Sequence, residues 1–252
     1  MQPYSAAPKM FLPGKVLALW TVILLGVGAL AKLAEIGVVT TQLVLASNYP
    51  ETVAATPGSE GAVSEMPSGN FQVILLLLNS TVSSFGLSLL TATAVMFLVW
   101  LHRAYSNLPS LGVPRPDFSS GWVIGSWFVP ILNLFRPYQI VKYIWNKSNP
   151  ETVGMGTIYY NTGGNYTLMA WWGFWLAGNI LSVRIYSDTE NLDVQMAVIL
   201  VGVFGSGLTI IAACLAIAVV RDINSRQEER RKRLMDASQQ QFWSADASPN
   251  IT

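Results

Sequence analysis

The chain has 252 residues, of which 52% are hydrophobic and only 12% are charged, and its formal net charge is +1. Ordinary globular chains carry roughly 25% charged residues, so a water-soluble fold of this length could not cover its surface with so few charges. The composition therefore predicts an integral membrane protein and excludes intrinsic disorder, a collagen-like chain and a disulfide scaffold.

Apolar stretches follow one another along the chain. They cover residues 16–46, 71–101, 122–135, 167–185 and 194–220. A membrane-spanning helix needs about 20 mostly apolar residues. Four of the stretches meet that length, whereas 122–135 is short and contains Pro130 and Asn133. The sequence thus predicts an all-α integral membrane protein with a four-span helical bundle over residues 16–220.

The distribution of Lys and Arg predicts the orientation of these spans. The arm over residues 1–15 and the tail over 221–252 contain basic residues, whereas the loops 47–70 and 186–193 contain acidic residues without Lys or Arg. Basic residues lie on both sides of 122–135, so we expect that stretch to enter and leave on one side, as a re-entrant or interfacial segment. Both termini are then cytoplasmic, with the chain in the cell membrane.

Small residues recur at helical spacing in three of the predicted spans. Lipid tails are as apolar as Leu, so membrane helices associate mainly through close packing of small side chains. The predicted helix-packing residues are Ser80, Ser84, Ser88, Ala92, Gly173, Ala177, Gly205 and Thr209. The alternative is a polar pore along residues 79–84, but this run contains no ionisable group, which favours packing.

Lys32 and Glu35 are spaced i,i+3, which places them on one helix face and predicts an ion pair. Charges inside a membrane are functional candidates by default. Both residues lie near the outer end of the first span, however, where long side chains reach the interface, so a structural role is favoured over a functional one.

The stretch that follows Phe135 is amphipathic at helical spacing. Tyr138, Val141 and Trp145 share one face, and a proline stands at its start, so we expect an interfacial helix over 137–147 that completes the re-entrant or interfacial region 122–147. Anionic lipid headgroups are the predicted partners of the basic residues beside that face. These residues are Arg136, Lys142 and Lys147.

Four sequence motifs occur in a characteristic order. They are WLHRAYSNLPSLG, GWVIGSWFVPILNLFRPYQIVKYIWNKSNP, MAWWGFWLAGNIL and AIAVVRDINSRQEER. Together they resemble a bacterial integral membrane family, domain of unknown function 4328, over about Phe71 to Arg230. The most specific positions are Trp127, Phe128, Pro130, Asn133, Pro137, Trp171 and Trp172. The family has no assigned activity, cofactor or partner, so the resemblance implies a membrane location and no chemistry.

Pro130 and Asn133 form the most unusual local sequence. Pro130 removes a backbone donor, and neighbouring groups must compensate for the loss within a membrane. An architectural wedge between helices is the favoured interpretation. A groove for a lipid or a small molecule, with Asn133 lining it, is the alternative.

Motifs for catalysis are missing from the sequence. The one histidine, His102, follows an aromatic residue at the end of a span, which favours an interfacial position over haem ligation, and the one cysteine, Cys214, lies in an apolar run. There is no phosphate-binding loop, zinc-protease motif or nucleophile elbow. We therefore predict no catalytic, cofactor-binding or metal-binding residue, no cofactor and no nucleic-acid partner.

The expected function is that of a non-catalytic multi-pass membrane protein. It would be a scaffold or an accessory subunit that packs against a larger membrane complex or against itself. A small transporter or channel is one alternative, and it would need Asn79, Asn133 and Asn179 to converge within the membrane. A membrane sensor, with the basic tail 221–252 as its output, is another.

Overall fold

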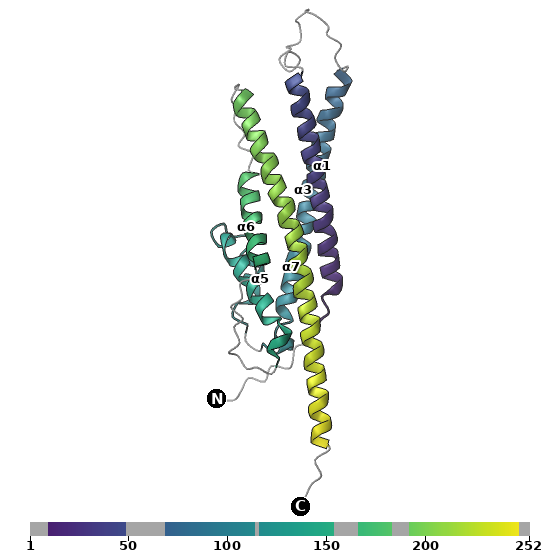
Figure 1. Cartoon of the computed structure of the whole chain (residues 1–252), viewed down its shortest axis with the longest axis vertical. Coiled ribbons are helices and arrows are strands. Elements are labelled where there is room, and N and C mark those ends of the chain that lie inside the picture. The colour runs from purple at the N-terminus through teal and green to yellow at the C-terminus, as the bar shows by residue number, and fades with distance from the viewer. Residues whose placement is uncertain (1–9, 49–68, 114–115, 154–165, 183–191, 247–252) are drawn as a thin grey trace, which may run out of the picture. The chain divides into compact units, whose positions relative to one another are not determined.

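The computed structural model describes residues 10–48, 69–113, 116–153, 166–182 and 192–246 (Figure 1). These residues are helical or form turns and short loops, and no strand occurs among them, as the sequence predicted. The four long helices are α1 (Lys15–Asn48), α3 (Gly69–Ser106), α6 (Tyr166–Leu181) and α7 (Leu192–Asp246). The shorter elements are α4 (Ser120–Gly125), α5 (Arg136–Lys147), η1 (Pro109–Leu111), η2 (Leu132–Leu134) and η3 (Pro150–Thr152).

Three of the described helices are long and apolar enough to cross a membrane, over Lys15–Val44 in α1, Ser80–Ser106 in α3 and Met196–Trp243 in α7. These helices suggest a membrane-embedded protein, because a helix satisfies all its backbone hydrogen bonds within one segment. Helix α6 has 16 residues, or about 24 Å, which is shorter than the roughly 30 Å of a hydrocarbon core. The fourth span thus stays a prediction. Most of the two acidic loops lies outside the described residues.

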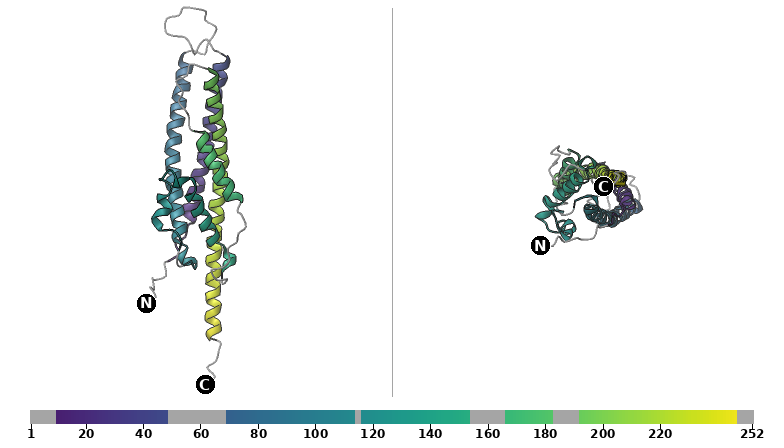
Figure 2. Two further views of the ribbon diagram at one scale, coloured as in Figure 1. Left: turned by 90° about the vertical axis from the view of Figure 1, so that its left-hand side faces the viewer. Right: turned by 90° about the horizontal axis from the view of Figure 1, so that it is seen from below.

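Helix α7 continues well beyond the end of the predicted span. It runs without interruption from Leu192 to Asp246, and Figure 2 shows it changing from green to yellow along one continuous helix. The helix that contains the last predicted span therefore continues into the charged tail. Glu229 and Arg233, four residues apart, form an ion pair of 2.9 Å on its surface.

Residues 122–135 do not form a single helix. Helix α4 ends at Gly125, residues 126–131 form turns that include Pro130, and η2 follows. The helix is therefore interrupted around Pro130, the position where the sequence lacks a backbone donor. Helix α5 then begins at Arg136, with Pro137 in its first turn, where a proline leaves no hydrogen bond unmade.

The apolar face of α5 is packed inside the protein. Its buried residues are Pro137, Ile140, Val141, Ile144 and Trp145. Tyr138, which the helical spacing placed on the apolar face, is only partly buried. The face that we expected to lie in the membrane interface therefore contacts protein, and Lys142 on the opposite side is exposed.

The chain divides into two compact units. Unit 1 contains residues 1–23, 94–170 and 215–252, and unit 2 contains residues 24–93 and 171–214. The largest fully buried apolar side chains of unit 1 come from α3, the turn before η1, η1 itself, α4, α5, α6 and α7. They are Trp100, Leu101, Leu108, Leu111, Val123, Ile140, Val141, Ile144, Leu168, Val220 and Ile223.

Unit 2 contains a close contact between two helices. A methyl group placed on Gly178 of α6 would lie 2.7 Å from Oγ1 of Thr209 and 3.1 Å from the carbonyl oxygen of Gly205, both on α7. On α1, the Nζ atom of Lys32 lies 2.7 Å from Oε2 of Glu35. The ion pair predicted from their spacing is thus confirmed.

Candidate functional site

Two polar side chains of α7 are buried in unit 1 beside the ends of α3 and α5. Nε2 of Gln227 donates hydrogen bonds to the carbonyl oxygen of Ala104, at 2.8 Å, and to Oγ of Ser148, at 3.2 Å. Only 4% of Gln227 is exposed. Because a buried amide without partners costs free energy, these bonds are needed to place a glutamine there.

Arg230 lies one turn further along α7, and 7% of it is exposed. Its Nε donates to the carbonyl oxygen of Leu111 at 2.7 Å, and its Nη1 donates to the carbonyl oxygen of Asn149 at 2.6 Å and to Oγ1 of Thr152. None of these partners carries a charge. Leu111 ends η1 and Asn149 is the first residue before η3, so the guanidinium satisfies backbone carbonyl groups at the boundaries of two short elements.

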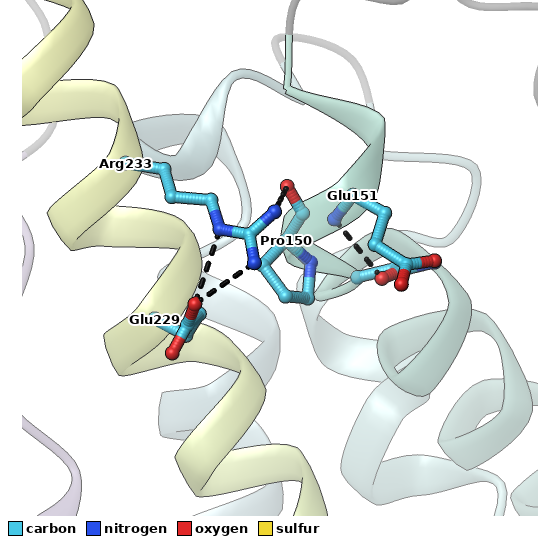
Figure 3. A network of polar contacts seen from close by, with 5 residues as sticks. Pro150, Glu151, Glu229 and Arg233 are labelled. Atoms are coloured by element: carbon cyan, nitrogen blue, oxygen red, sulfur yellow. Dashed lines mark hydrogen bonds and ion pairs between the residues drawn. The ribbon is translucent and has the colours of Figure 1, made fainter.

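The next turn of α7 also contacts the segment after α5, as Figure 3 shows. Arg233 donates to Oε1 of Glu229 at 2.9 and 3.1 Å and to the carbonyl oxygen of Pro150 at 3.4 Å. Oδ1 of Asn149 accepts a hydrogen bond of 3.1 Å from the backbone nitrogen of Glu151, which caps η3. We call Gln227, Arg230, Asn149 and their partners the α7 clamp.

Trp145 of α5 also contacts α7, at Asp222, between one and two turns before Gln227. Its indole nitrogen donates to Oδ2 of Asp222, whose Oδ1 accepts from Nε of Arg226 at 3.0 Å. The guanidinium of Arg226 lies 4.0 Å from the centre of the Trp145 ring, a cation–π contact. The hydrogen bonds of this cluster and of the α7 clamp thus hold α3, α5 and α7 together.

A groove of about 650 Å³ lies in unit 1 between the first turns of α1 and the charged part of α7. Its lining residues are Lys15, Ala18, Leu19, Val22, Arg221, Asn224, Ser225, Glu228, Glu229 and Lys232. Nζ of Lys15 lies 3.9 Å from Oε2 of Glu228. The other carboxylate oxygen of Glu228 is buried and has no hydrogen-bond partner within the described part of the chain.

Helix α4 and the segment between α4 and α5 expose large apolar side chains. They are Trp122, Phe128, Val129, Ile131, Leu134 and Phe135. Phe128 and Ile131 are the most open, with 73% and 74% of each residue exposed. Large exposed apolar side chains are typical of surfaces that contact lipid or another protein.

The predicted family positions are divided between exposed and buried places. Phe128 and Pro130 are exposed, Pro137 is buried, and Trp127 packs edge-on against Phe97 with their ring centres 5.6 Å apart. Asn133 is partly buried, and its Oδ1 has no hydrogen-bond partner among the described residues. In unit 2, Trp171 and Trp172 are buried, with ring centres 5.5 Å apart.

The predicted packing residues also differ in their environments. Ser80, Ser84, Ser88 and Ala92 are all exposed, so the described residues do not cover that face of α3. Oγ of Ser88 donates to the carbonyl oxygen of Ser84 at 3.0 Å, which satisfies it within its own helix.

On the other helices, Gly205 and Thr209 lie at the contact between α6 and α7. Gly173 is exposed, with no atom within 4 Å of the position that an added methyl group would occupy, and Ala177 is partly buried. The residue of α6 that makes the contact is Gly178. It directly follows Ala177, so the four-residue spacing from Gly173 to Ala177 does not select it.

The residues considered for chemistry do not form a catalytic group in the described part of the chain. Nε2 of His102 lies 2.8 Å from Oγ of Ser120, but no acidic group contacts the other ring nitrogen there. Those residues also contain no group of three potential metal ligands. Nδ2 of Asn179 donates to the carbonyl oxygen of Trp175 at 2.7 Å, and the side chain of Asn79 lies outside the described structure.

The basic residues predicted to face lipid headgroups lie next to aromatic rings. Arg136 lies over Phe118 at 5.2 Å, Lys142 over Tyr138 at 5.8 Å and Lys147 over Tyr143 at 5.7 Å. These contacts hold the cations at the surface of α5.

The spacing of residues along α7 contains a signal for the α7 clamp. The charged composition of the tail does not show it. Buried positions of α7 recur at intervals of three or four residues through Ala216, Val220, Ile223, Gln227 and Arg230. The interval continues while the residue type changes from apolar to polar. Periodicity, followed past the end of the hydrophobic stretch, would have identified Gln227 and Arg230.

Comparison with known families gives one match. The sequence profile described as Domain of unknown function (DUF4328) matches residues 76–225, which is more than half of the chain. No match was found among curated proteins or among solved structures.

Proposed function

The chain belongs to the DUF4328 family, a domain of unknown function, and we propose that it is a non-catalytic multi-pass membrane protein that acts as a scaffold or accessory subunit. The α7 clamp is the observation that supports this proposal most directly. Gln227 and Arg230 are buried polar residues, and both bind backbone carbonyl groups or hydroxyls of unit 1. Such residues stabilise a fixed surface.

In the membrane, we propose four spans, with α6 as the third, and both termini in the cytoplasm. Residues 122–135 enter one leaflet without crossing it. The exposed side chains of Phe128 and Ile131 support this arrangement, because large apolar groups gain free energy in lipid. The basic residues Lys142 and Lys147 then lie beside anionic headgroups of the same leaflet.

The contact surface for a partner subunit, or for a second copy, is the exposed small-residue face of α3. Ser84 lies within this face, and Val95, about three turns further along α3, is also exposed but bulky. Helices in lipid pack closely where small residues allow their backbones to approach each other. The exposed serine face of a helix that is apolar enough to span therefore supports a helix–helix contact with another polypeptide.

The test uses the full chain purified from its native membrane in mild detergent. Native mass spectrometry should show a defined stoichiometric complex, with a second polypeptide or a second copy. A cysteine introduced as Ser84→Cys in a Cys214→Ala background should cross-link to that polypeptide. Ser84→Leu should dissociate the complex, whereas the matched control Val95→Leu should retain it. A monomer without partners, or equal behaviour of the two Leu variants, contradicts the proposal.

A further inference from the structure

The groove between α1 and α7 combines an apolar wall with a wall that carries both signs of charge. Ala18, Leu19 and Val22 of α1 form the apolar wall. Arg221 and Lys232 of α7 are exposed cations, and Glu228 and Glu229 are anions on the same helix. We propose that this groove binds the headgroup of a phospholipid with a primary amine, of the phosphatidylethanolamine type. This inference rests on the proposed membrane location and does not depend on the scaffold role.

The position of the groove along both helices suits an amphiphile. Lys15 is the first residue of α1 and of the stretch Lys15–Val44 that is apolar enough to cross a membrane. Leu19 is 58% exposed and Ile23, one turn further on, is 41% exposed. A lipid whose headgroup lies at Lys15 can therefore place an acyl chain against the apolar side chains of α1. A volume of about 650 Å³ is within the roughly 300–1,000 Å³ of small-molecule sites.

The cations of the groove are suited to the phosphate. The side chain of Lys15 is 70% exposed even though it lies near Glu228, and Arg221 and Lys232 are exposed on the opposite wall. Ammonium and guanidinium groups form strong, charge-assisted hydrogen bonds with phosphate oxygens. A phosphodiester in the groove would thus contact donors from both helices.

Glu228 supplies the preference for a primary amine. Its Oε1 is buried without a hydrogen-bond partner among the described residues, and Lys15 approaches only the other oxygen, at 3.9 Å. Glu229 already pairs with Arg233. A carboxylate oxygen without a donor costs free energy. The side chain of Glu228 lines the groove and is 25% exposed, so a turn of its carboxyl group would let Oε1 accept from the ammonium of phosphatidylethanolamine, which provides N–H donors. A choline headgroup has no N–H group, and a glycerol headgroup has no positive charge to offset Glu228.

The experiment compares lipids that differ only in the headgroup. The full-length wild-type chain, delipidated in detergent, is titrated with phosphatidylethanolamine, its mono- and dimethyl derivatives, phosphatidylcholine and phosphatidylglycerol of identical acyl chains, and bound lipid is counted by native mass spectrometry. We expect affinity to fall with each methyl group, by roughly tenfold over the series, because charge-assisted hydrogen bonds are lost. Equal affinity for the first and last members of the series overturns the proposal without any variant being made.

A pair of charge-matched variants locates the site. Glu228→Gln should abolish the preference for phosphatidylethanolamine over phosphatidylcholine. Asp236→Asn, which removes the same charge further along α7 and outside the groove, should keep it. An unchanged preference in Glu228→Gln places the lipid elsewhere and overturns the assignment. These results are separate from the scaffold test, because neither a lost nor a retained headgroup preference alters whether a partner subunit is present at α3.

Discussion

Gly178 on α6 lies so close to Thr209 on α7 that an added methyl group would come within 2.7 Å of its Oγ1 and 3.0 Å of its backbone nitrogen. Oγ1 of Thr209 also donates to the carbonyl oxygen of Gly205 at 3.0 Å. The two helices therefore meet backbone to backbone in unit 2. Small residues permit this kind of approach, and it is a principal source of helix association in membranes.

Gly178→Ala should consequently destabilise the protein. The methyl group would collide with backbone as well as with side-chain atoms, and overpacking of this kind costs about 1–3 kcal/mol. Thermal unfolding in detergent measures the effect. The control is Gly173→Ala on the same helix, where no atom lies within 4 Å, so that the variant should be neutral or more stable by up to about 1 kcal/mol. If the two variants unfold at the same temperature, α6 and α7 do not pack as described.

Arg230→Met should destabilise unit 1 strongly. The substitution removes the donors of the carbonyl groups of Leu111 and Asn149, and each buried group left without a partner costs about 1–3 kcal/mol. Arg230→Lys should recover only part of the loss, because a single ammonium cannot reproduce the geometry of the guanidinium.

The matched control for Arg230 is Arg233→Met, one turn away. Arg233 pairs with Glu229 at a solvent-exposed site, where ion pairs contribute about 0–1 kcal/mol. Thermal unfolding of the three variants in one detergent gives the comparison. A loss for Arg233→Met as large as that for Arg230→Met would show that the α7 clamp does not hold the fold.

The sequence predicted the elements of this fold better than their contacts. The all-helical structure, the break at Pro130 and the pair of Lys32 and Glu35 follow from composition, proline chemistry and i,i+3 spacing. These are local effects, so a single sequence contains the information for them. The start of α5 beside Pro137 is of the same kind.

Contacts between distant segments could not be obtained in this way. The bonds from Arg230 to Leu111 and Asn149 join residues 119 and 81 positions apart. In the sequence Arg230 is one member of a basic run, and basic residues after a span have a sufficient explanation in membrane orientation. Which arginine of the run is buried depends on the rotation of α7 against α3 and α5, and only the three-dimensional arrangement fixes that rotation.

The residues before and after 122–135 should lie on the same side of the membrane. Asp117 before this segment and Glu151 after it are exposed, which makes them suitable positions for labelling. In a Cys214→Ala background, Asp117→Cys and Glu151→Cys should both resist an impermeant thiol reagent in intact cells and react after permeabilisation. Protection of one position with labelling of the other would mean that residues 122–135 cross the membrane.

Ser120 should not react as a nucleophile, although its Oγ lies 2.8 Å from Nε2 of His102. A serine needs a histidine that a third group holds in the correct tautomer, and the described residues supply no carboxylate to His102. The pair instead connects α3 to the first turn of α4, so His102→Gln, which can still hydrogen-bond, should fold as the wild type does. The purified chain, treated with a fluorophosphonate probe and analysed by mass spectrometry, should carry no label on Ser120. Labelling that disappears in His102→Gln would identify an activated serine and contradict the non-catalytic function.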